Sequence, residues 1–292
     1  MGMSMIVERF APSPTGLLHI GHAYSAWRCF KSARDVGGRF LLRMEDLDAS
    51  RVREAYYDAI ERDLHWLELD WDGPVLRQSH RREAYAEVID YLWSLDLLYR
   101  CTCTRRDIQE AIVAPQEGEN SGSQIYPGTC RNKKTAFESE GALRLDLEAA
   151  IDRLGGAERL EMTRIRSASD SCAALPETVD VALLQNTVGD VVIVRRDGVP
   201  AYHLTVVIDD AFQGVTHVTR GADLAEATHV QRVLQALLSY PDPVYRHHRL
   251  VRDESGKRLA KRDDARAISS YREAGLSPGD VFRMIGVSDP AG

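Results

Sequence analysis

Apolar positions in the first hundred residues recur at strand spacing and at helix spacing in turn. Short apolar runs at 5–10 and 40–46 predict two buried strands. Apolar residues at helical spacing predict helices over 20–36, 52–67 and 81–95. Strands that alternate with helices are typical of a parallel sheet with crossover helices. The pattern therefore predicts an α/β fold.

The pattern is interrupted and then returns in the second half of the chain. Residues 114–124 contain almost no large apolar side chain and predict a mobile loop. A strand is predicted from residue 191, followed by a buried helix at 201–212 and an amphipathic helix at 224–239. We therefore expect the parallel sheet of the first hundred residues to resume at residue 191.

The composition limits the class of protein. The chain has 292 residues, of which 44% are hydrophobic, and this supplies a substantial core. Its formal net charge of -7 does not indicate a general nucleic-acid binder, so a contact with RNA has to be local, and the basic stretch at 245–252 is a candidate. No apolar run approaches the ~18 residues that span a membrane, and the N-terminus lacks an export signal, so we expect a cytoplasmic protein without membrane contact.

Two histidines stand where the first predicted helix begins. His19 and His22 are three residues apart, so both lie on the first turn of a helix that starts at Ile20 or Gly21. The N–H groups and the dipole of a helix start favour phosphate, and Gly21 has no side chain to block a flat base or a ribose. A nucleotide site is one interpretation, and histidines that cap the helix or lie on the surface are the other.

Three of the five cysteines fall in one pattern. Cys101-x-Cys103 is followed by Tyr126 and, after three residues, by Cys130. Thiolates suit Zn²⁺, but a structural zinc site usually has four ligands, and no fourth cysteine or histidine lies nearby. Tyrosine is a rare ligand and C-x-C pairs also arise without a metal. Spacing alone therefore leaves both a zinc site and a group of free thiols open.

Five motifs, in order along the chain, carry a resemblance to a known family. They are RFAPSPTGLLHIGH at 9–22, RMEDLD at 43–48, DWDG at 70–73, the segment at 201–224, and KRLAKR at 257–262. Together they resemble the signatures of class I aminoacyl-tRNA synthetases, in the form carried by glutamyl enzymes. The resemblance implies an enzyme that makes an aminoacyl adenylate from an amino acid and ATP, with Mg²⁺, and then transfers the acyl group to RNA.

The resemblance also implies an architecture. It is a Rossmann-like class I catalytic domain with an inserted zinc-bearing subdomain and a small C-terminal helical segment. We expect the first half of the catalytic domain at 1–100, the inserted subdomain at 101–190, the second half at 191–240, and the KMSKS-like loop with short helices at 241–292. Because the two nucleotide motifs lie near opposite ends of the chain, the fold has to bring them to one ATP.

The family motifs imply roles for particular residues. His19, His22 and Lys261 are expected to act in catalysis, and the same residues with Gly21 to bind ATP. Ala260 stands where a serine is usual, so the hydroxyl that commonly bonds the nucleotide is absent there. The residues expected to bind glutamate are Arg9, Phe10, Ala11, Pro12, Ser13, Glu45, Tyr202 and Arg220.

The chemistry of glutamate agrees with that set. Two carboxylates need guanidinium groups, and an ammonium group needs a carboxylate such as Glu45. Without the resemblance, Arg9 and Glu45 would be interpreted as an ion pair between adjacent strands, and Tyr202 as an ordinary core tyrosine.

Within the family, the chain resembles a subfamily of short glutamyl enzymes that attach glutamate to the queuosine base of tRNA(Asp). This implies one Zn²⁺ per chain, bound by Cys101, Cys103, Tyr126 and Cys130. Only 30 residues follow Arg262, and we expect these to form small helices rather than an anticodon-binding domain. The expected partners are L-glutamate, ATP and tRNA(Asp) carrying queuosine, with no obligate protein partner. The alternatives are a truncated glutamyl-tRNA synthetase that charges the tRNA 3′ end and a non-catalytic RNA-binding relative.

Overall fold

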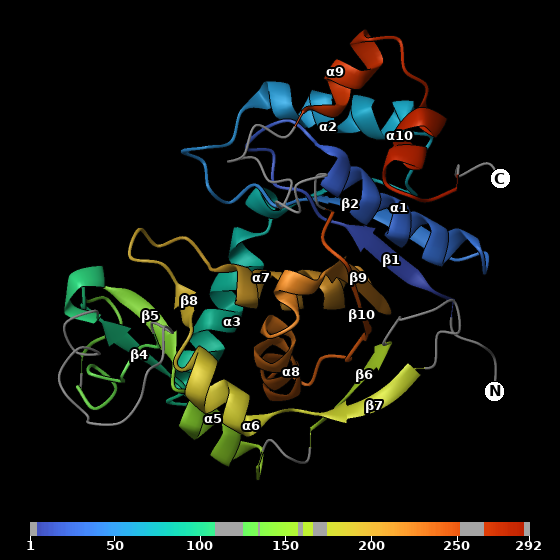
Figure 1. Ribbon diagram of the computed structural model, residues 1–292. Coiled ribbons are helices and arrows are strands. Elements are labelled where there is room, and N and C mark those ends of the chain that lie inside the picture. The colour runs from blue at the N-terminus through green and yellow to red at the C-terminus, as the bar shows by residue number, and fades with distance from the viewer. Residues whose placement is uncertain are drawn as a thin grey trace.

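Two parallel strands and the helix between them begin the fold. Strands β1 (Val7–Phe10) and β2 (Arg39–Met44) pair in parallel, and helix α1 (Ile20–Arg34) connects them. Gly37 follows α1 with a φ of 67°, a backbone conformation that favours glycine. The first two predicted strands and the helix between them are confirmed. The computed structural model, drawn in Figure 1, describes residues 5–108, 125–133, 135–156, 160–165, 174–251 and 266–288.

The next elements extend this half of the molecule. Helices α2 (Glu54–Trp66) and α3 (Arg82–Ser94) confirm the other two predicted helices, and β3 (Leu76–Arg77) between them pairs with β2. The short helices α9 (Ile268–Glu273) and α10 (Pro278–Met284) lie beside α2 in Figure 1. One buried apolar cluster contains side chains from α1, β2, α2 and α10, so segments near the two ends of the chain share a core.

Four later strands form a second sheet in the order β7-β6-β10-β9. Strand β10 pairs in parallel with both β6 and β9, and β7 pairs with β6 in the antiparallel sense. Strand β9 also lies beside β1, where the Thr216 N–H donates to the Val7 carbonyl at 3.0 Å. The two sheets therefore meet at β1, and the predicted α/β class with a parallel sheet is confirmed. The bounds are β6 (Glu161–Ile165), β7 (Ala174–Thr178), β9 (His217–Gly221) and β10 (Val244–His248).

A third, antiparallel sheet is made of β4 (Leu98–Cys101), β5 (Ala142–Leu145) and β8 (Val192–Val194). The expectation that the parallel sheet resumes at residue 191 was wrong, because β8 pairs with β5. Its apolar residues signal a buried strand but do not specify a neighbour. Ile193 is buried in the same cluster as β4, β5, α7 and α8 side chains, and this packing holds β8 in the third sheet. The division of the chain into domains stays a prediction.

Helices from the second half pack around this apolar cluster. The predicted helices at 201–212 and 224–239 are confirmed. Asp209 lies within the first of them, is fully buried, and accepts hydrogen bonds from Gln78, Arg81 and Tyr85 at 2.6–2.8 Å. This carboxylate therefore ties the helix to α3 and the turn before it. The bounds are α5 (Leu147–Arg153), α6 (Val181–Leu183), α7 (Tyr202–Phe212) and α8 (Ala227–Leu237).

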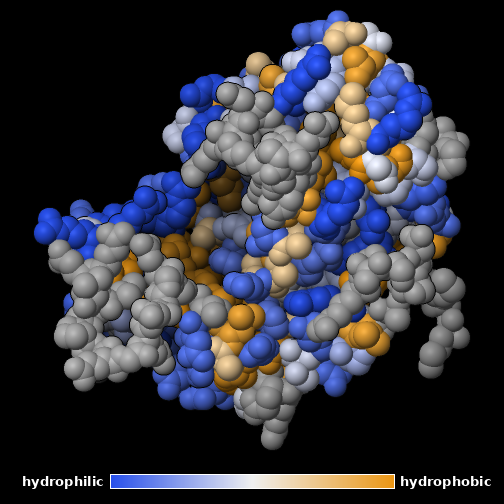
Figure 2. Space-filling view, viewed as in Figure 1, coloured by the Kyte–Doolittle hydropathy of each residue, from blue (hydrophilic) through white to orange (hydrophobic). Residues whose placement is uncertain are grey.

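The surface of the molecule is mostly hydrophilic on the face that Figure 2 shows. Figure 2 shows hydrophilic residues over much of one face, with hydrophobic residues gathered in patches near its middle. Among the described residues, no helix combines the length and the apolar character needed to cross a membrane. The predicted loop at 114–124 and the KRLAKR motif at 257–262, with Ala260 and Lys261, lie outside the described residues.

Candidate active site

His19 and His22, the two histidines of the HIGH motif at residues 19–22, cap helix α1. The Gly21 N–H donates to His19 Nδ1 at 3.1 Å, and the His19 N–H donates to His22 Nδ1 at 3.2 Å. The two rings lie 3.8 Å apart. A neutral imidazole whose Nδ1 accepts a hydrogen bond carries its proton on Nε2. Capping therefore sets both rings in the tautomer that has an Nε2–H donor, so the capping and nucleotide interpretations are compatible.

The chain beyond the KRLAKR motif returns to this turn. Ala267 forms an isolated bridge with His19, and the Ile268 N–H donates to the Leu18 carbonyl at 2.9 Å. Residues 252–265, which include Lys261, are outside the described part of the chain. The described segment that follows them is thus in contact with the HIGH turn.

A cavity of about 390 Å³ lies beside the HIGH turn, where the carboxyl ends of β1 and β9 meet α1 and α7. His22 lines it, whereas His19 and Gly21 do not. The structure also brings together in its wall every residue predicted to bind glutamate, and their binding of glutamate stays a prediction. These residues are Arg9, Phe10, Ala11, Pro12, Ser13, Glu45, Tyr202 and Arg220.

One side of the cavity contains a closed group of buried charges. Asp210 Oδ1 accepts from Arg9 Nε at 2.9 Å and from an Arg43 terminal nitrogen at 2.6 Å. Burial by itself would raise the pKa of Asp210, but the two guanidinium groups hold it below its usual value. Arg9 therefore pairs with Asp210, and not with Glu45 as the ion-pair interpretation assumed.

Glu45 is less tightly held in the same group. Its Oε1 lies 3.6 Å from Arg43 Nη2, a longer contact than those made by Asp210. Burial raises the pKa of Glu45, and Arg43 and Arg9 partly offset the increase. A substrate ammonium group would supply the close cationic partner that this carboxylate has only at longer range.

The other side of the cavity has a different character. Arg220 is 5% exposed and donates to the Tyr202 hydroxyl at 3.2 Å, to Thr228 Oγ1 at 2.8 Å and to His247 Nε2 at 3.3 Å. All three partners are neutral, and no carboxylate of the described residues lies within ion-pair distance of Arg220. A buried charge without a counterion is costly. Arg220 is therefore suited to pair with an anion that enters the cavity.

Several residues of this arrangement were not found from the sequence. Asp210 and Arg43 hold the paired side, and Thr228 and His247 hold the other. Asp210 and Arg43 each stand in an apolar segment, which is a signal that a buried charge needs a partner. Thr228 and His247 carry no such signal, since nothing in the sequence pairs their elements with Arg220.

The predicted metal ligands come together beyond β4. The ligand atoms of Cys101, Cys103 and Cys130 all lie within 4.8 Å of one another. The Tyr126 hydroxyl is 3.8 Å from Cys103 Sγ and accepts from the Cys130 N–H at 2.8 Å. Burial opposes ionisation of Cys130, but hydrogen bonds from Tyr126 and from the Thr102 N–H lower its pKa to about 6. A group of three thiols with a thiolate-prone member could hold zinc.

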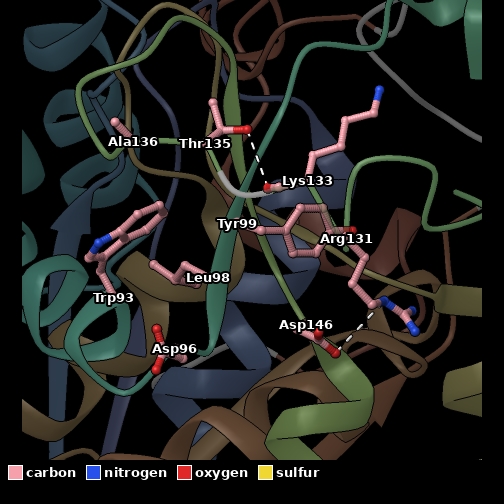
Figure 3. Close-up of a pocket in the computed structure, with 9 residues that line it drawn as sticks. All are labelled: Trp93, Asp96, Leu98, Tyr99, Arg131, Lys133, Thr135, Ala136 and Asp146. Carbon is pink, nitrogen blue, oxygen red and sulfur yellow. Dashed lines mark hydrogen bonds and ion pairs between the residues drawn. The ribbon is translucent and has the colours of Figure 1, made fainter.

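A second cavity, of about 490 Å³, lies near this cysteine cluster and is shown in Figure 3. Arg131 and Asp146 lie side by side in its wall, with 3.8 Å between their charged atoms, and Arg131 also pairs with the buried Asp190 at 3.0 Å. No predicted site residue lines this cavity. Its walls are Trp93, Asp96, Leu98, Tyr99, Arg131, Lys133, Thr135, Ala136 and Asp146.

The described part of the basic stretch, residues 245–251, is largely packed against the rest of the chain. Tyr245 and His248 are buried, and residues 244–248 form β10 inside the second sheet. Arg246 donates to Ser32 Oγ at 3.0 Å, and Arg249 donates to the Ile285 carbonyl at 2.7 Å. Arg249 is nevertheless exposed, so an RNA contact at this stretch stays a prediction.

Solved structures identify the class of protein that this fold defines. The chain superposes on the methionyl-tRNA synthetase of Mycobacterium tuberculosis with a TM-score of 0.58 at 15% identity, over 96% of this chain and 64% of that one, a likeness of fold alone. The fold is that of a class I aminoacyl-tRNA synthetase catalytic domain. A family model described as tRNA synthetases class I (E and Q), catalytic domain, matches residues 5–288, and the chain belongs to this family.

Relatives within the family are similar over most of the chain. A Glutamyl-Q tRNA(Asp) synthetase of Rhodobacter capsulatus is 49% identical over 97% of this chain and 100% of its own length. The protein of the same name from Deinococcus radiodurans is 43% identical over 95% of this chain and 86% of its own length. The glutamate tRNA ligase of Elizabethkingia meningosepticum, solved in complex with its amino acid, gives a TM-score of 0.73 at 25% identity. The alignment covers 97% of this chain but only 60% of that ligase.

Proposed function

We propose that the protein activates L-glutamate with ATP to form glutamyl-adenylate and transfers the glutamate to the queuosine base at the wobble position of tRNA(Asp). The observation that carries the proposal is the Arg220 guanidinium, a buried cation with neutral partners in a cavity that also holds Glu45. A free amino acid with an anionic side chain has the charges that such a cavity lacks. Glutamate is such a molecule.

The first chemical step needs no protein nucleophile. The α-carboxylate oxygen of glutamate forms a bond to the α-phosphorus of ATP, and the bond to pyrophosphate breaks. The protein has to align the two reactants and stabilise the charge on the phosphoryl group. His19 and His22, with their Nε2–H donors, are proposed to bind phosphate together with Lys261, and Gly21 to leave room for the nucleoside. Mg²⁺ bound with ATP would neutralise phosphate charge.

Glutamate is proposed to bind by complementary charge. Glu45 receives the α-ammonium group and Arg220 receives a carboxylate, with the Tyr202 hydroxyl beside it. Arg9 contributes positive charge from the opposite wall, although Asp210 already pairs with it. The backbone and small side chains of residues 10–13 would then fix the position of the substrate along β1.

Zinc is proposed to bind at the cysteine cluster. Cys101, Cys103 and Cys130 would supply thiolates and Tyr126 the fourth ligand, giving the four-coordinate arrangement of a structural site. The donor set fits the metal because three sulfur atoms already lie together and the phenol oxygen adjoins them. The metal would stabilise the local fold beyond β4 and take no part in adenylate formation.

Queuosine as acceptor is supported by the relatives that carry this activity in their names and align along nearly the whole chain. A conventional glutamyl-tRNA synthetase that charges the tRNA 3′ end is the second candidate. It is favoured by the structural likeness to the glutamate tRNA ligase, of which this chain spans 60%. Both candidates share the activation step and differ in the acceptor.

One experiment separates them. Purified protein is given ATP, labelled glutamate and tRNA(Asp) with or without queuosine, and tRNA(Glu) in parallel. We expect label only on queuosine-containing tRNA(Asp), and glutamate-dependent exchange of pyrophosphate into ATP before any tRNA is added. The Glu45→Gln variant, which keeps the shape of the side chain and removes its charge, is the inactive control. Equal labelling of both forms of tRNA(Asp), or labelling of tRNA(Glu) alone, would support 3′-end charging instead.

A further inference from the structure

Arg220 is oriented by hydrogen bonds to three different elements and by the Tyr245 ring, whose centroid lies 5.4 Å from the guanidinium carbon. Arginine has five N–H donors in a fixed plane, and Arg220 uses three of them on Tyr202, Thr228 and His247. These partners belong to α7, α8 and β10. Two N–H groups remain for an anion in the cavity. The bond to His247 is the one made by Nε, the nitrogen that joins the guanidinium group to its side chain, and it restrains the guanidinium plane together with the other two.

His247 is held in place by the sheet and by a neighbouring ring. It is the direct partner of Arg220 in the parallel β9–β10 register, so the two side chains lie on the same face. Its ring stacks on Tyr245 two residues earlier, with 6.4 Å between centroids and 2° between planes. Tyr245 is buried and its hydroxyl accepts from Gln235 at 2.8 Å. The acceptor for Arg220 is therefore attached to a rigid support.

The imidazole acts here as a neutral acceptor. His247 Nε2 lies 3.3 Å from Arg220 Nε, which can only donate, and 3.2 Å from the Thr228 hydroxyl. Nε2 must therefore be unprotonated. Burial and the Arg220 charge lower the pKa of His247 to about 3, so the ring is neutral at physiological pH. A carboxylate in this place could orient Arg220 equally well, but it would also cancel the charge that the substrate needs.

We propose that His247 is a positioning residue for glutamate: it fixes the Arg220 guanidinium in the cavity while leaving the charge of Arg220 uncompensated. The opposite wall provides the contrast, since Arg9 is held there by a carboxylate, Asp210. The inference rests on the proposed function, because it assumes that the anion bound by Arg220 belongs to glutamate.

Three variants of His247 separate orientation from charge. His247→Gln offers a neutral acceptor, His247→Leu offers none, and His247→Glu offers a charged acceptor. In pyrophosphate exchange, we expect the Leu and Glu variants to raise the KM for glutamate about 10- to 100-fold, the range of a hydrogen bond to a charged group. The Gln variant should recover most of the loss. The kcat and the KM for ATP should change little in all three.

Two controls make the result specific. His217→Leu removes a partly buried histidine of β9 that contacts Thr216 and does not line the cavity, and it should leave the KM for glutamate unchanged. In an Arg220→Lys background, His247→Leu should add no further increase in KM, because the positioned group is already gone.

A Leu variant with the parental KM for glutamate overturns the positioning role, and a Glu variant that equals the Gln variant overturns the role of neutrality. If the Leu variant does not fold, the Gln and Glu variants, which differ only in charge, decide the second point and test the site directly. A wild-type protein that exchanges no pyrophosphate with any glutamate concentration overturns the proposed function, and this inference with it.

Discussion

The two walls of the cavity hold arginine in opposite ways. On one wall, Arg9 and Arg43 share a buried carboxylate, Asp210, at 2.9 and 2.6 Å. On the other, Arg220 is equally buried but bonds only to a phenol, a hydroxyl and an imidazole. On the first wall, which we call the paired wall, the charges of Arg9 and Arg43 are balanced by carboxylates of the protein without a ligand. On the second wall, the charge of Arg220 is balanced only when an anion binds. The charges of the first wall therefore stabilise the fold, and the charge of the second is available for a ligand.

The comparison also explains how one cavity can receive a molecule with both signs of charge. Glu45 lies on the paired wall, but its contact with Arg43 is 3.6 Å long, so the carboxylate retains capacity for another cation. Arg220 on the other wall retains capacity for an anion. The loosely paired carboxylate of Glu45 and the cation of Arg220 are thus on different walls, and they do not pair with each other when the cavity is empty.

The largest expected effect is loss of the shared carboxylate. In Asp210→Ala, Arg9 loses its counterion and Arg43 keeps only Glu45 at 3.6 Å, and breaking a buried pair in this way costs about 3–5 kcal/mol of the free energy of unfolding. Urea denaturation measures the difference. Asp197→Ala is the control, because its carboxylate is 51% exposed and pairs with Arg195 at the surface. A loss of less than about 1 kcal/mol would mean that the paired wall is not needed for folding.

Removal of the unpaired cation should affect binding rather than folding. Arg220→Met keeps much of the side-chain volume and deletes the charge, so a substrate carboxylate would be buried without a partner. We expect kcat/KM for glutamate activation to fall by a factor that corresponds to about 2–5 kcal/mol of lost transition-state stabilisation, with the KM for ATP unchanged. Arg283→Met, whose side chain is 75% exposed on α10, is the control. A variant that activates glutamate as well as the wild type would assign the substrate carboxylate to the paired wall instead.

The cysteine cluster provides a third region for the comparison, because it shares no residue with the cavity wall. We expect metal analysis to find one zinc per chain and none in Cys130→Ala. Since separated sites are nearly independent, glutamate activation should change by no more than about twofold in that variant. Cys29→Ala, which removes a buried thiol on α1 outside the cluster, should keep the metal. Purified wild-type protein without zinc would contradict the assignment.

The sequence predicted charged residues that line the cavity, but not the residues that bind them. Arg9, Glu45 and Arg220 stand in family motifs, and apolar periodicity predicted β1, which carries Arg9, and β2, which ends beside Glu45, but not β9, which carries Arg220. The partners of the arginines could not be predicted, because Asp210 and His247 reach them through contacts between elements far apart in the chain. The same limit explains the error over β8, whose residues indicate burial without indicating the strand it pairs with.

The smallest expected effect is a change in the free energy of unfolding that has opposite signs on the two walls. In the ligand-free protein, Arg220→Met removes a buried charge that has no counterion, and sites kept unfavourable for function often gain about 0.5–2 kcal/mol of stability when they are relieved. Arg9→Met removes one of two charged donors to Asp210 and should lose about 1.5–3 kcal/mol. The two substitutions are chemically identical, so urea denaturation of both variants without glutamate isolates the effect of the surroundings. If both variants lose stability equally, Arg220 is compensated in the empty cavity, and the distinction between the two walls does not hold.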